Sequence, residues 1–177
     1  MKVIDLSQDI YDAMPVFPGD PEAKVSLVYT IEKDEWNMTR MEINAHDGTH
    51  VNVPSHSSIK GKTLDEYKIA DFTGESYVYS PKESIKPNKG IIFVDHDIDM
   101  DIAKKIVAAK PKFIGLSSRF EFDLIVEKYL LGENIISFER LENADLLPTD
   151  RSFMFYGVPL KIRAGDGSPV RAFAIVD

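Results

Sequence analysis

The chain has 177 residues, of which 44% are hydrophobic and 28% are charged, a balance typical of a globular protein. Its formal net charge of −8 argues against a nucleic-acid partner, and no apolar run is long enough to cross a membrane. Cysteine is absent, which excludes disulfides and thiolate metal sites and fits a reducing cytoplasm. We therefore expect one cytoplasmic domain over residues 1–177, without a signal peptide, because three aspartates interrupt the first twelve positions.

Short strands are predicted in the first half of the chain. They are expected over residues 2–6, 24–31, 36–43 and 76–79, where β-branched, aromatic and other apolar residues gather. Residues 38–43, MTRMEI, alternate apolar with polar side chains, which predicts a strand with one buried face. The turn sequences PGDPE and PNKG separate these segments.

The second half alternates strands with helices. Strands are predicted over residues 90–94, 113–118 and 135–138, and helices over residues 101–109 and 122–131. Asp99 or Asp101 is expected to cap the first of these helices. Residues 153–176 predict two further strands joined by a tight hairpin turn at Asp166-Gly167. A β-rich half followed by alternating strands and helices predicts a single mixed α/β domain, although the order of its strands does not follow from the pattern.

Three of the four histidines lie within residues 46–56, HDGTHVNVPSH. Imidazole is a common ligand of zinc and other first-row metals, and catalytic zinc sites usually hold three protein ligands and one open position. On a straight strand His46 and His56 would lie roughly 33 Å apart, too far for one metal. The segment must therefore bend, and Gly48 and Pro54 are the residues that permit a bend. The candidate metal-binding residues are His46, His50, Asn52 and His56, and the other interpretation is a group of unrelated surface histidines.

The segment HDGTHVNVPSH resembles the HxGTHxDxPxH motif of the metal-dependent cyclase-like hydrolases, which include bacterial kynurenine formamidases and isatin hydrolases. Four more stretches are similar to that family and follow in its order: MPVFPGDP, GKTLDEY, YLLGENIISFERLENADLLP and PLKIRAGDGSPVRAFAI. The resemblance implies a swivelling β/β/α fold, assembled as a homodimer or larger oligomer. It also implies hydrolysis of a small amide, lactam or lactone, such as an aryl formamide or a cyclic amide.

The same resemblance implies a role for individual residues. His46 and His50 would be metal ligands, and Glu139 would be a further metal-binding carboxylate. His56 would be the general acid/base, and Phe17 would pack against the substrate ring.

Two positions depart from the family pattern. Asn52 stands where the family has an aspartate that can bridge two metals, and Glu127 stands where a two-metal formamidase has a histidine. Because two neighbouring cations need a bridging anion, we expect one divalent ion, Zn²⁺ or Mn²⁺, and we doubt a second. The ligands would be His46, His50 and Glu139, with Asn52 contributing weakly or through water. Glu127 would share the proton transfer with His56 if it is not a ligand.

Two alternatives stay open at this point. One is a degenerate family member with an empty metal site that binds a small molecule or a partner without catalysis, and Asn52 is its main support. Retention of the three clustered histidines and Glu139 favours the enzyme. His96, in the acidic stretch VDHDIDMD, is interpreted as part of a solvated loop before a helix, the alternative being a replacement ligand for the missing histidine.

Overall fold

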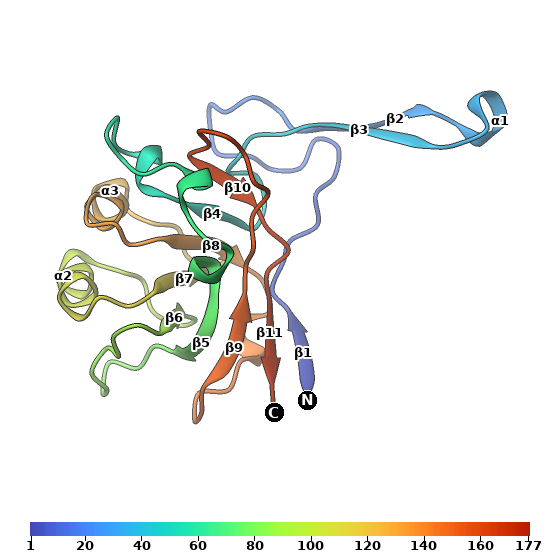
Figure 1. Cartoon of the computed structure of the whole chain (residues 1–177). Coiled ribbons are helices and arrows are strands. Elements are labelled where there is room, and N and C mark those ends of the chain that lie inside the picture. Colours follow the sequence, from blue (N-terminus) through green and yellow to red (C-terminus); the bar gives the residue numbers. More distant parts are fainter.

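The computed structural model describes residues 1–177 and contains a nine-stranded sheet (Figure 1). The order of the strands is β1-β11-β9-β5-β6-β7-β8-β4-β10. The four strands β5 to β8 run parallel to one another, and every other pairing in this sheet is antiparallel. The strands are β1 Lys2–Asp5, β4 His50–Asn52, β5 Thr73–Val78, β6 Gly90–Phe93, β7 Phe113–Ser117, β8 Ser137–Leu141, β9 Phe153–Tyr156, β10 Gly167–Pro169 and β11 Phe173–Val176. The predicted single mixed α/β domain is confirmed.

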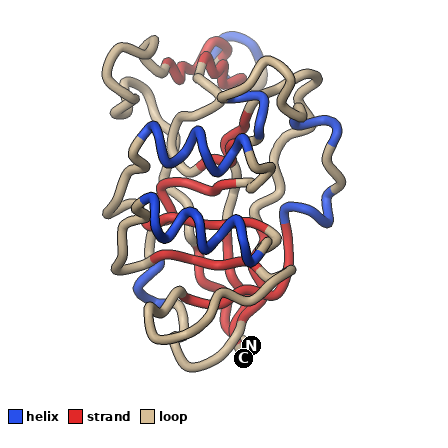
Figure 2. Tube along the Cα trace, turned by 90° about the vertical axis from the view of Figure 1, so that its left-hand side faces the viewer, coloured by secondary structure: helices blue, strands red, loops and turns tan.

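Two helices connect the parallel strands and cover one face of the sheet (Figure 2). Helix α2, Met100–Ala109, joins β6 to β7, and helix α3, Leu124–Gly132, joins β7 to β8. Parallel strands need such crossover connections, which explains the alternating pattern in the second half of the sequence. Asp99 caps α2 as predicted, because its side chain accepts a hydrogen bond from the backbone N–H of Ile102 at 2.8 Å. No helix in the structure combines the length and the apolar character needed to cross a membrane.

One hydrophobic core lies between the two helices and the sheet, and a second core lies on the opposite face of the curled sheet. Phe113, Phe138 and Phe155 lie at its centre, with ring centroids 4.9–5.3 Å apart. These rings come from three separate strands and are fully buried. The short 3-10 helices η1 Pro54–His56, η2 Leu64–Glu66, η3 Ile69–Phe72 and η4 Ala144–Leu146 lie in the connections. Leu64 and Phe72 from these connections pack into the same core.

A two-stranded arm extends away from the body of the molecule (Figure 1). It consists of β2, Lys24–Tyr29, and β3, Met38–Glu42, with the one-turn helix α1, Ile31–Asp34, at its tip. The strand predicted over residues 38–43 is present as β3, but its predicted burial on one face is wrong, because every residue of β3 is exposed. An alternating pattern indicates burial only when one face of the sheet packs on a core, and β3 pairs with β2 alone.

The end of the chain also differs from the expectation. Asp166-Gly167 does not form a hairpin turn, because Gly167 opens β10, a strand that pairs with β4. β9 and β11 pair directly with each other, with Phe173 opposite Tyr156. The local Asp-Gly turn pattern is overridden by a strand more than a hundred residues earlier in the chain, which no local pattern can reveal.

Candidate active site

The predicted bend in the histidine segment is confirmed. Gly48 has φ +63°, β4 starts two residues later at His50, and Pro54 begins the 3-10 helix that ends at His56. The chain therefore folds back instead of running straight. The ring centroid of His46 lies 5.3 Å from that of His50 and 4.0 Å from that of His56.

The three imidazoles line a cavity of about 240 Å³. β4 pairs with β8 on one side and β10 on the other, and this register places His50 opposite Glu139. All seven residues that the sequence indicated line this cavity, namely Phe17, His46, His50, Asn52, His56, Glu127 and Glu139. The remaining lining residues are Asp20, Glu121, Phe122, Leu124 and Arg140.

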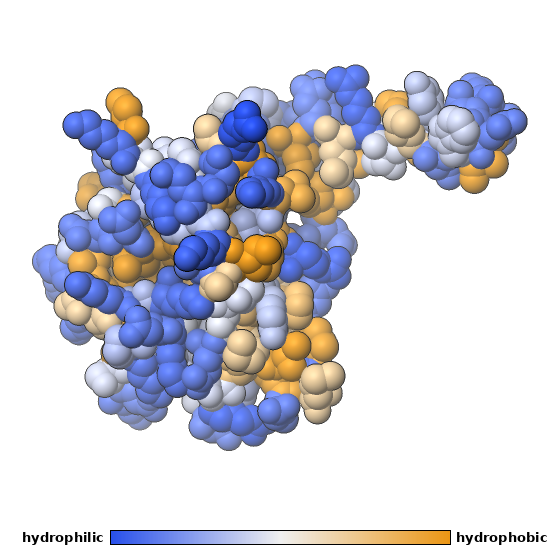
Figure 3. Space-filling model, viewed as in Figure 1, coloured by the Kyte–Doolittle hydropathy of each residue, from blue (hydrophilic) through white to orange (hydrophobic).

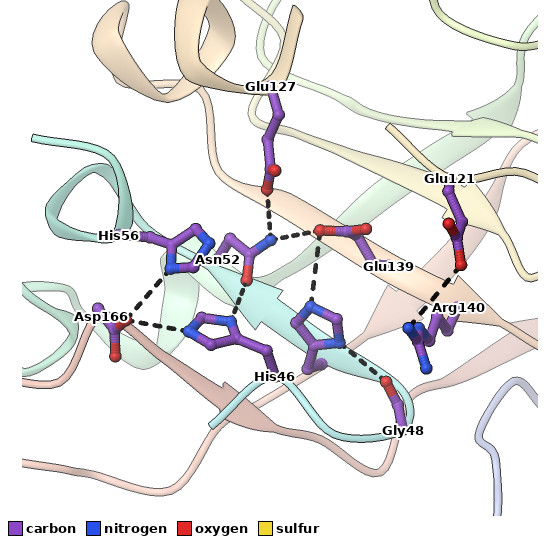
Figure 4. A network of polar contacts seen from close by, with 10 residues as sticks. His46, Gly48, Asn52, His56, Glu121, Glu127, Glu139, Arg140 and Asp166 are labelled. Carbon is purple, nitrogen blue, oxygen red and sulfur yellow. Dashed lines mark hydrogen bonds and ion pairs between the residues drawn. The ribbon is translucent and has the colours of Figure 1, made fainter. Parts of the chain in front are cut away.

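Each of two histidines has one ring nitrogen held by an acceptor that fixes the ring (Figure 4). His50 donates from Nδ1 to the carbonyl of Gly48 at 2.8 Å, which leaves its Nε2 as the free nitrogen, 3.5 Å from Oε1 of Glu139. His46 Nε2 lies 3.0 Å from a carboxylate oxygen of Asp166, and its Nδ1 lies 2.7 Å from Oδ1 of Asn52. A histidine whose outer nitrogen is held in this way presents the other nitrogen as a metal ligand.

The contact between His46 and Asn52 brings two acceptors together. A neutral His46 ring that donates to Asp166 has only a lone pair on Nδ1, and Oδ1 of Asn52 is also an acceptor. Two such atoms 2.7 Å apart repel each other unless a proton or another cation lies between them or beside both. This pair is therefore suited to bind a cation.

The amide nitrogen of Asn52 lies between two carboxylates (Figure 4). It donates to Oε1 of Glu127 at 2.6 Å and also contacts Oε1 of Glu139. Asn52 comes from β4, Glu127 from α3 and Glu139 from β8, so three separate elements hold this cluster. The neutral amide of Asn52 thus bridges the two glutamates by donating a hydrogen bond to each.

Asp166 is a site residue that the sequence analysis missed. One of its carboxylate oxygens lies 3.0 Å from His46 Nε2 and 3.2 Å from His56 Nδ1. It directly precedes Gly167, where a side chain has no room, since an added Cβ would lie 2.6 Å from His46 Cε1. The only sequence signal for Asp166 was its place in a stretch that resembles the family, and that stretch was interpreted as a turn.

Burial and neighbouring groups shift the pKa values of Glu127 and Glu139 in opposite directions. Burial, together with the negative charge of Glu139, raises the pKa of Glu127 to about 8. Burial also opposes ionisation of Glu139, but its contact with His50 and its hydrogen bonds outweigh this effect and lower its pKa. Without a bound ion, Glu127 is the protonated member of the pair and Glu139 the ionised member near neutral pH.

The pKa of His56 is lowered, mainly by burial and then by the neighbouring His46 ring, although its contact with Asp166 acts in the opposite direction. The pKa of Asp166 is also lowered, because the hydrogen bonds to His46 and His56 outweigh the effect of its burial. A neutral imidazole beside a fixed carboxylate is the arrangement of a general base.

The chemistry of the donor atoms fits a divalent metal ion. Nitrogen and oxygen donors of this kind are ligands for zinc and manganese. Two donor groups share His46. One comprises Nδ1 of His46, Nε2 of His50, Oδ1 of Asn52 and Oε1 of Glu139, which are linked by the pairwise contacts His46–Asn52, His50–Glu139 and Asn52–Glu139. The other comprises His46, His56 and Asp166, and it is the one group of histidine and acidic side chains whose ligand atoms all lie within 4.8 Å of one another.

His96 does not take part in this site. It does not line the cavity, and its ring stands edge-on to Tyr79, 5.4 Å between centroids. The interpretation of His96 as part of a loop before a helix is confirmed, and its interpretation as a replacement ligand is wrong.

The Cyclase family model matches residues 4–114, more than half of the chain. The chain belongs to the cyclase family. This cyclase-family protein is 30% identical to an uncharacterized protein of Methanocaldococcus jannaschii, with 99% of this chain and 100% of that one covered. It is 25% identical to the kynurenine formamidase of Salinibacter ruber, with 97% of this chain and 96% of that one covered.

Two solved structures share the fold of this cyclase-family chain. One is described as a potential metal-dependent hydrolase with cyclase activity, with a TM-score of 0.79, 20% identity, and coverage of 98% of this chain and 96% of that one. The other is an isatin hydrolase bound to the product analogue thioisatinate, with a TM-score of 0.80, 17% identity, and coverage of 99% and 92%. The fold that the resemblance implied is therefore the fold observed.

Proposed function

We propose that this protein is a metal-dependent hydrolase of a small amide, lactam or lactone, such as an aryl formamide or a cyclic amide. The observation that carries the proposal is the arrangement of the three clustered histidines. Nδ1 of His46 faces Asn52, and Nε2 of His50 faces Glu139. His56 is held by Asp166 at the same cavity. The kynurenine formamidase and the isatin hydrolase among its relatives support this class of reaction.

We assign one divalent ion, Zn²⁺ or Mn²⁺, to His46, His50 and Glu139, with Asn52 as a weak carbonyl ligand. Such an ion, when bound, supplies Lewis acidity for the substrate carbonyl and makes a water molecule more acidic. Asp166 belongs to the supporting groups in this assignment, because it contacts two imidazoles and can fix the outer nitrogen of His46. We assign no second ion between Glu127 and Glu139, because the Asn52 amide already donates to both.

His56 moves the proton in this mechanism. Its Nδ1–H donates to Asp166, so its Nε2 carries the lone pair and accepts a proton from the attacking water. The same nitrogen then returns the proton to the nitrogen or oxygen that leaves the substrate carbonyl. Glu127 would share the proton transfer, because its carboxyl group lies in the same cavity and contacts the Asn52 amide at 2.6 Å.

The apolar part of the cavity would hold the body of the substrate. Phe17, Phe122 and Leu124 line it, and they offer a surface for an aromatic or cyclic group. Phe17 is half exposed and lines the cavity, so it would pack against a ligand at the rim.

The first experiment measures metal content and hydrolysis together. Protein purified without chelator should contain about one equivalent of divalent metal and should hydrolyse an aryl formamide when Zn²⁺ or Mn²⁺ is supplied. Replacing His56 by alanine should lower kcat by about 10²- to 10⁴-fold, the usual contribution of a general acid/base, and should leave the metal content unchanged. His96→Ala is the matched control, because this histidine lies outside the cavity.

Other results would contradict the proposal. Absence of metal at any supply, together with no turnover of aryl formamides and cyclic amides, would favour a small-molecule binding protein. If His56→Ala removes the metal and His50→Ala does not, the ion is held by His46, His56 and Asp166 instead.

We further propose that the protein assembles as a homodimer or larger homo-oligomer. The support is the arm formed by β2 and β3, which carries many exposed apolar side chains. These are Leu27, Val28, Tyr29, Ile31, Trp36, Met38 and Met41. Figure 3 shows a few of them in orange among the polar residues of the arm. An isolated two-stranded hairpin is only marginally stable in water, so a neighbouring subunit that covers this arm would stabilise it.

A further inference from the structure

Arg140 reaches the active-site cavity because the strand is irregular at this point. Glu139 and Arg140 are consecutive residues of β8, yet both line the cavity. Neighbouring side chains of a regular strand point to opposite faces of the sheet. Here the register between β7 and β8 shifts, and Arg140 has φ +55°, a left-handed conformation that is uncommon for a residue with a side chain.

The left-handed backbone of Arg140 is held in place from the histidine segment. The hydroxyl group of Thr49 donates to the carbonyl oxygen of Arg140 at 2.6 Å. Thr49 directly precedes His50, so the contact links Arg140 to the residues that face the candidate metal. Irregular strand geometry next to an active site commonly serves to aim a side chain.

The guanidinium group of Arg140 has no close acceptor in the protein. Its side chain is only 19% exposed, and its nearest carboxylate is Glu121, 3.9 Å away and 73% exposed. That distance is too long for a hydrogen bond, so the guanidinium donors of this partly buried side chain are left for another partner. Arginine is suited to bind a carboxylate with two parallel hydrogen bonds.

The surroundings of Arg140 are acidic. Asp20, Glu121, Glu127 and Glu139 line the same cavity, and apart from the histidines Arg140 is the only basic residue that does so. Apart from the histidines and the proposed metal ion, Arg140 is therefore the one positive group in this cavity that can attract an anionic ligand. The apolar residues Phe17, Phe122 and Leu124 line the rest of the cavity.

We infer that Arg140 binds a carboxylate group of the substrate. The substrate would then be an amide that carries this carboxylate on an aromatic or otherwise apolar group. The inference rests on the proposed function for the reaction itself, and it adds the charge of the substrate. The amide group would lie at the histidines, the ring against the apolar residues, and the carboxylate on the guanidinium. Arg140 is thus a residue that determines specificity.

The test compares charged substrates with their neutral counterparts. The probes are the three positional isomers of formamidobenzoate and their methyl esters. For at least one isomer, kcat/KM of the wild-type protein should favour the carboxylate over its ester by about 10- to 100-fold, as expected for hydrogen bonds to a charged group. Arg140→Gln should reduce this preference at least tenfold, mainly through KM, and Arg140→Lys should keep part of it.

Two further variants separate specificity from folding. Arg140→Gly removes the side chain and suits the left-handed backbone, so it should fold and should lose the preference in the same way. Arg119→Gln removes one positive charge outside the cavity, and it should keep the preference. Equal rates for acid and ester in the wild-type protein, or equal losses on both in Arg140→Gln, would overturn the inference.

A binding measurement separates this inference from the proposed function. Titration calorimetry with benzoate, with benzamide as the neutral control, requires no turnover. Benzoate binding that is lost in Arg140→Gln, in a protein that hydrolyses no amide, would support the carboxylate site and refute the hydrolase. If the formamide group is hydrolysed at equal rates in the formamidobenzoates and in their methyl esters, and benzoate binding does not depend on Arg140, the hydrolase is supported and the carboxylate site is refuted.

Discussion

Asn52 stands where the HxGTHxDxPxH motif that this segment resembles has an aspartate. Its amide nitrogen donates to Glu127 and contacts Glu139, and its carbonyl oxygen faces His46. An aspartate at the same place would add a third carboxylate to two existing ones, so that without a cation their charges would repel one another. We therefore expect that the amide nitrogen of Asn52, in place of a carboxylate oxygen, lowers the number of cations that this cluster binds.

We predict that Asn52→Asp binds more metal than the wild-type protein and needs it for stability. Without metal, the loss of two hydrogen bonds and the added charge should lower the free energy of unfolding by about 1–3 kcal/mol. Zn²⁺ or Mn²⁺ should restore it, and the metal content should rise from about one equivalent toward two. Denaturant unfolding with and without chelator, together with elemental analysis, measures both quantities.

Asn88→Asp is the control for this prediction, because Asn88 is exposed and lies outside the cavity. An unchanged metal content in Asn52→Asp, with the same stability in the presence and absence of metal, would show that the side chain does not belong to the ion-binding cluster.

The histidine segment and the resemblance to the family together predicted most residues of the candidate cavity. The histidine segment, Glu127, Glu139 and Phe17 all line one cavity, because a short motif and its resemblance to the family indicated them directly. The sequence did not predict Asp166 as a site residue, because it lies 110 residues from His56 in the chain. Nothing in the local Asp-Gly pattern distinguishes a carboxylate of a site from a residue of a turn. Arg140 escaped because only the irregular strand turns it toward the cavity.

At the scale of elements, β10 holds the histidine segment in position. Gly167 pairs with Asn52 across the strands β10 and β4, and an added Cβ would lie 2.6 Å from His46 and 2.7 Å from the carbonyl oxygen of Val51. The backbone of β10 therefore packs directly against a candidate ligand.

We predict that Gly167→Ala displaces His46 and weakens metal binding. The crowding should lower the free energy of unfolding by about 1–3 kcal/mol, the usual range for overpacking. Competition with a chelator should show a higher Kd for Zn²⁺ in this variant. Gly132→Ala is the matched control, because a Cβ there meets no atom within 4 Å. Equal metal affinity in both variants would refute the assignment of His46 as a ligand.

Local patterns predicted the elements of the second half well and their partners poorly. The helices near residues 101–109 and 122–131 are present because caps and helical spacing are local properties, as Asp99 and Asp123 show. Strand pairing depends on distant segments, so neither the pairing of β10 with β4 nor the exposure of β3 was visible in the sequence.

At the scale of the whole molecule, the arm is separated from the body. We predict that sedimentation velocity finds a homodimer or larger species, and that Trp36→Lys combined with Met41→Lys shifts it toward the monomer, because charged side chains oppose burial of the arm. Ile59→Lys is the control, since Ile59 is also exposed but lies outside the arm. A monomeric wild-type protein at micromolar concentration, or an unchanged distribution in the double variant, would contradict the proposed assembly.

The amide bridge from Asn52 has a practical consequence for handling this protein. Because the Asn52 amide donates to both glutamates, we expect Glu127 and Glu139 to keep their positions when the proposed ion is removed. We therefore expect that the metal-free protein can be reloaded with a chosen element. Cobalt or cadmium could then serve as a spectroscopic reporter of the site without refolding the chain.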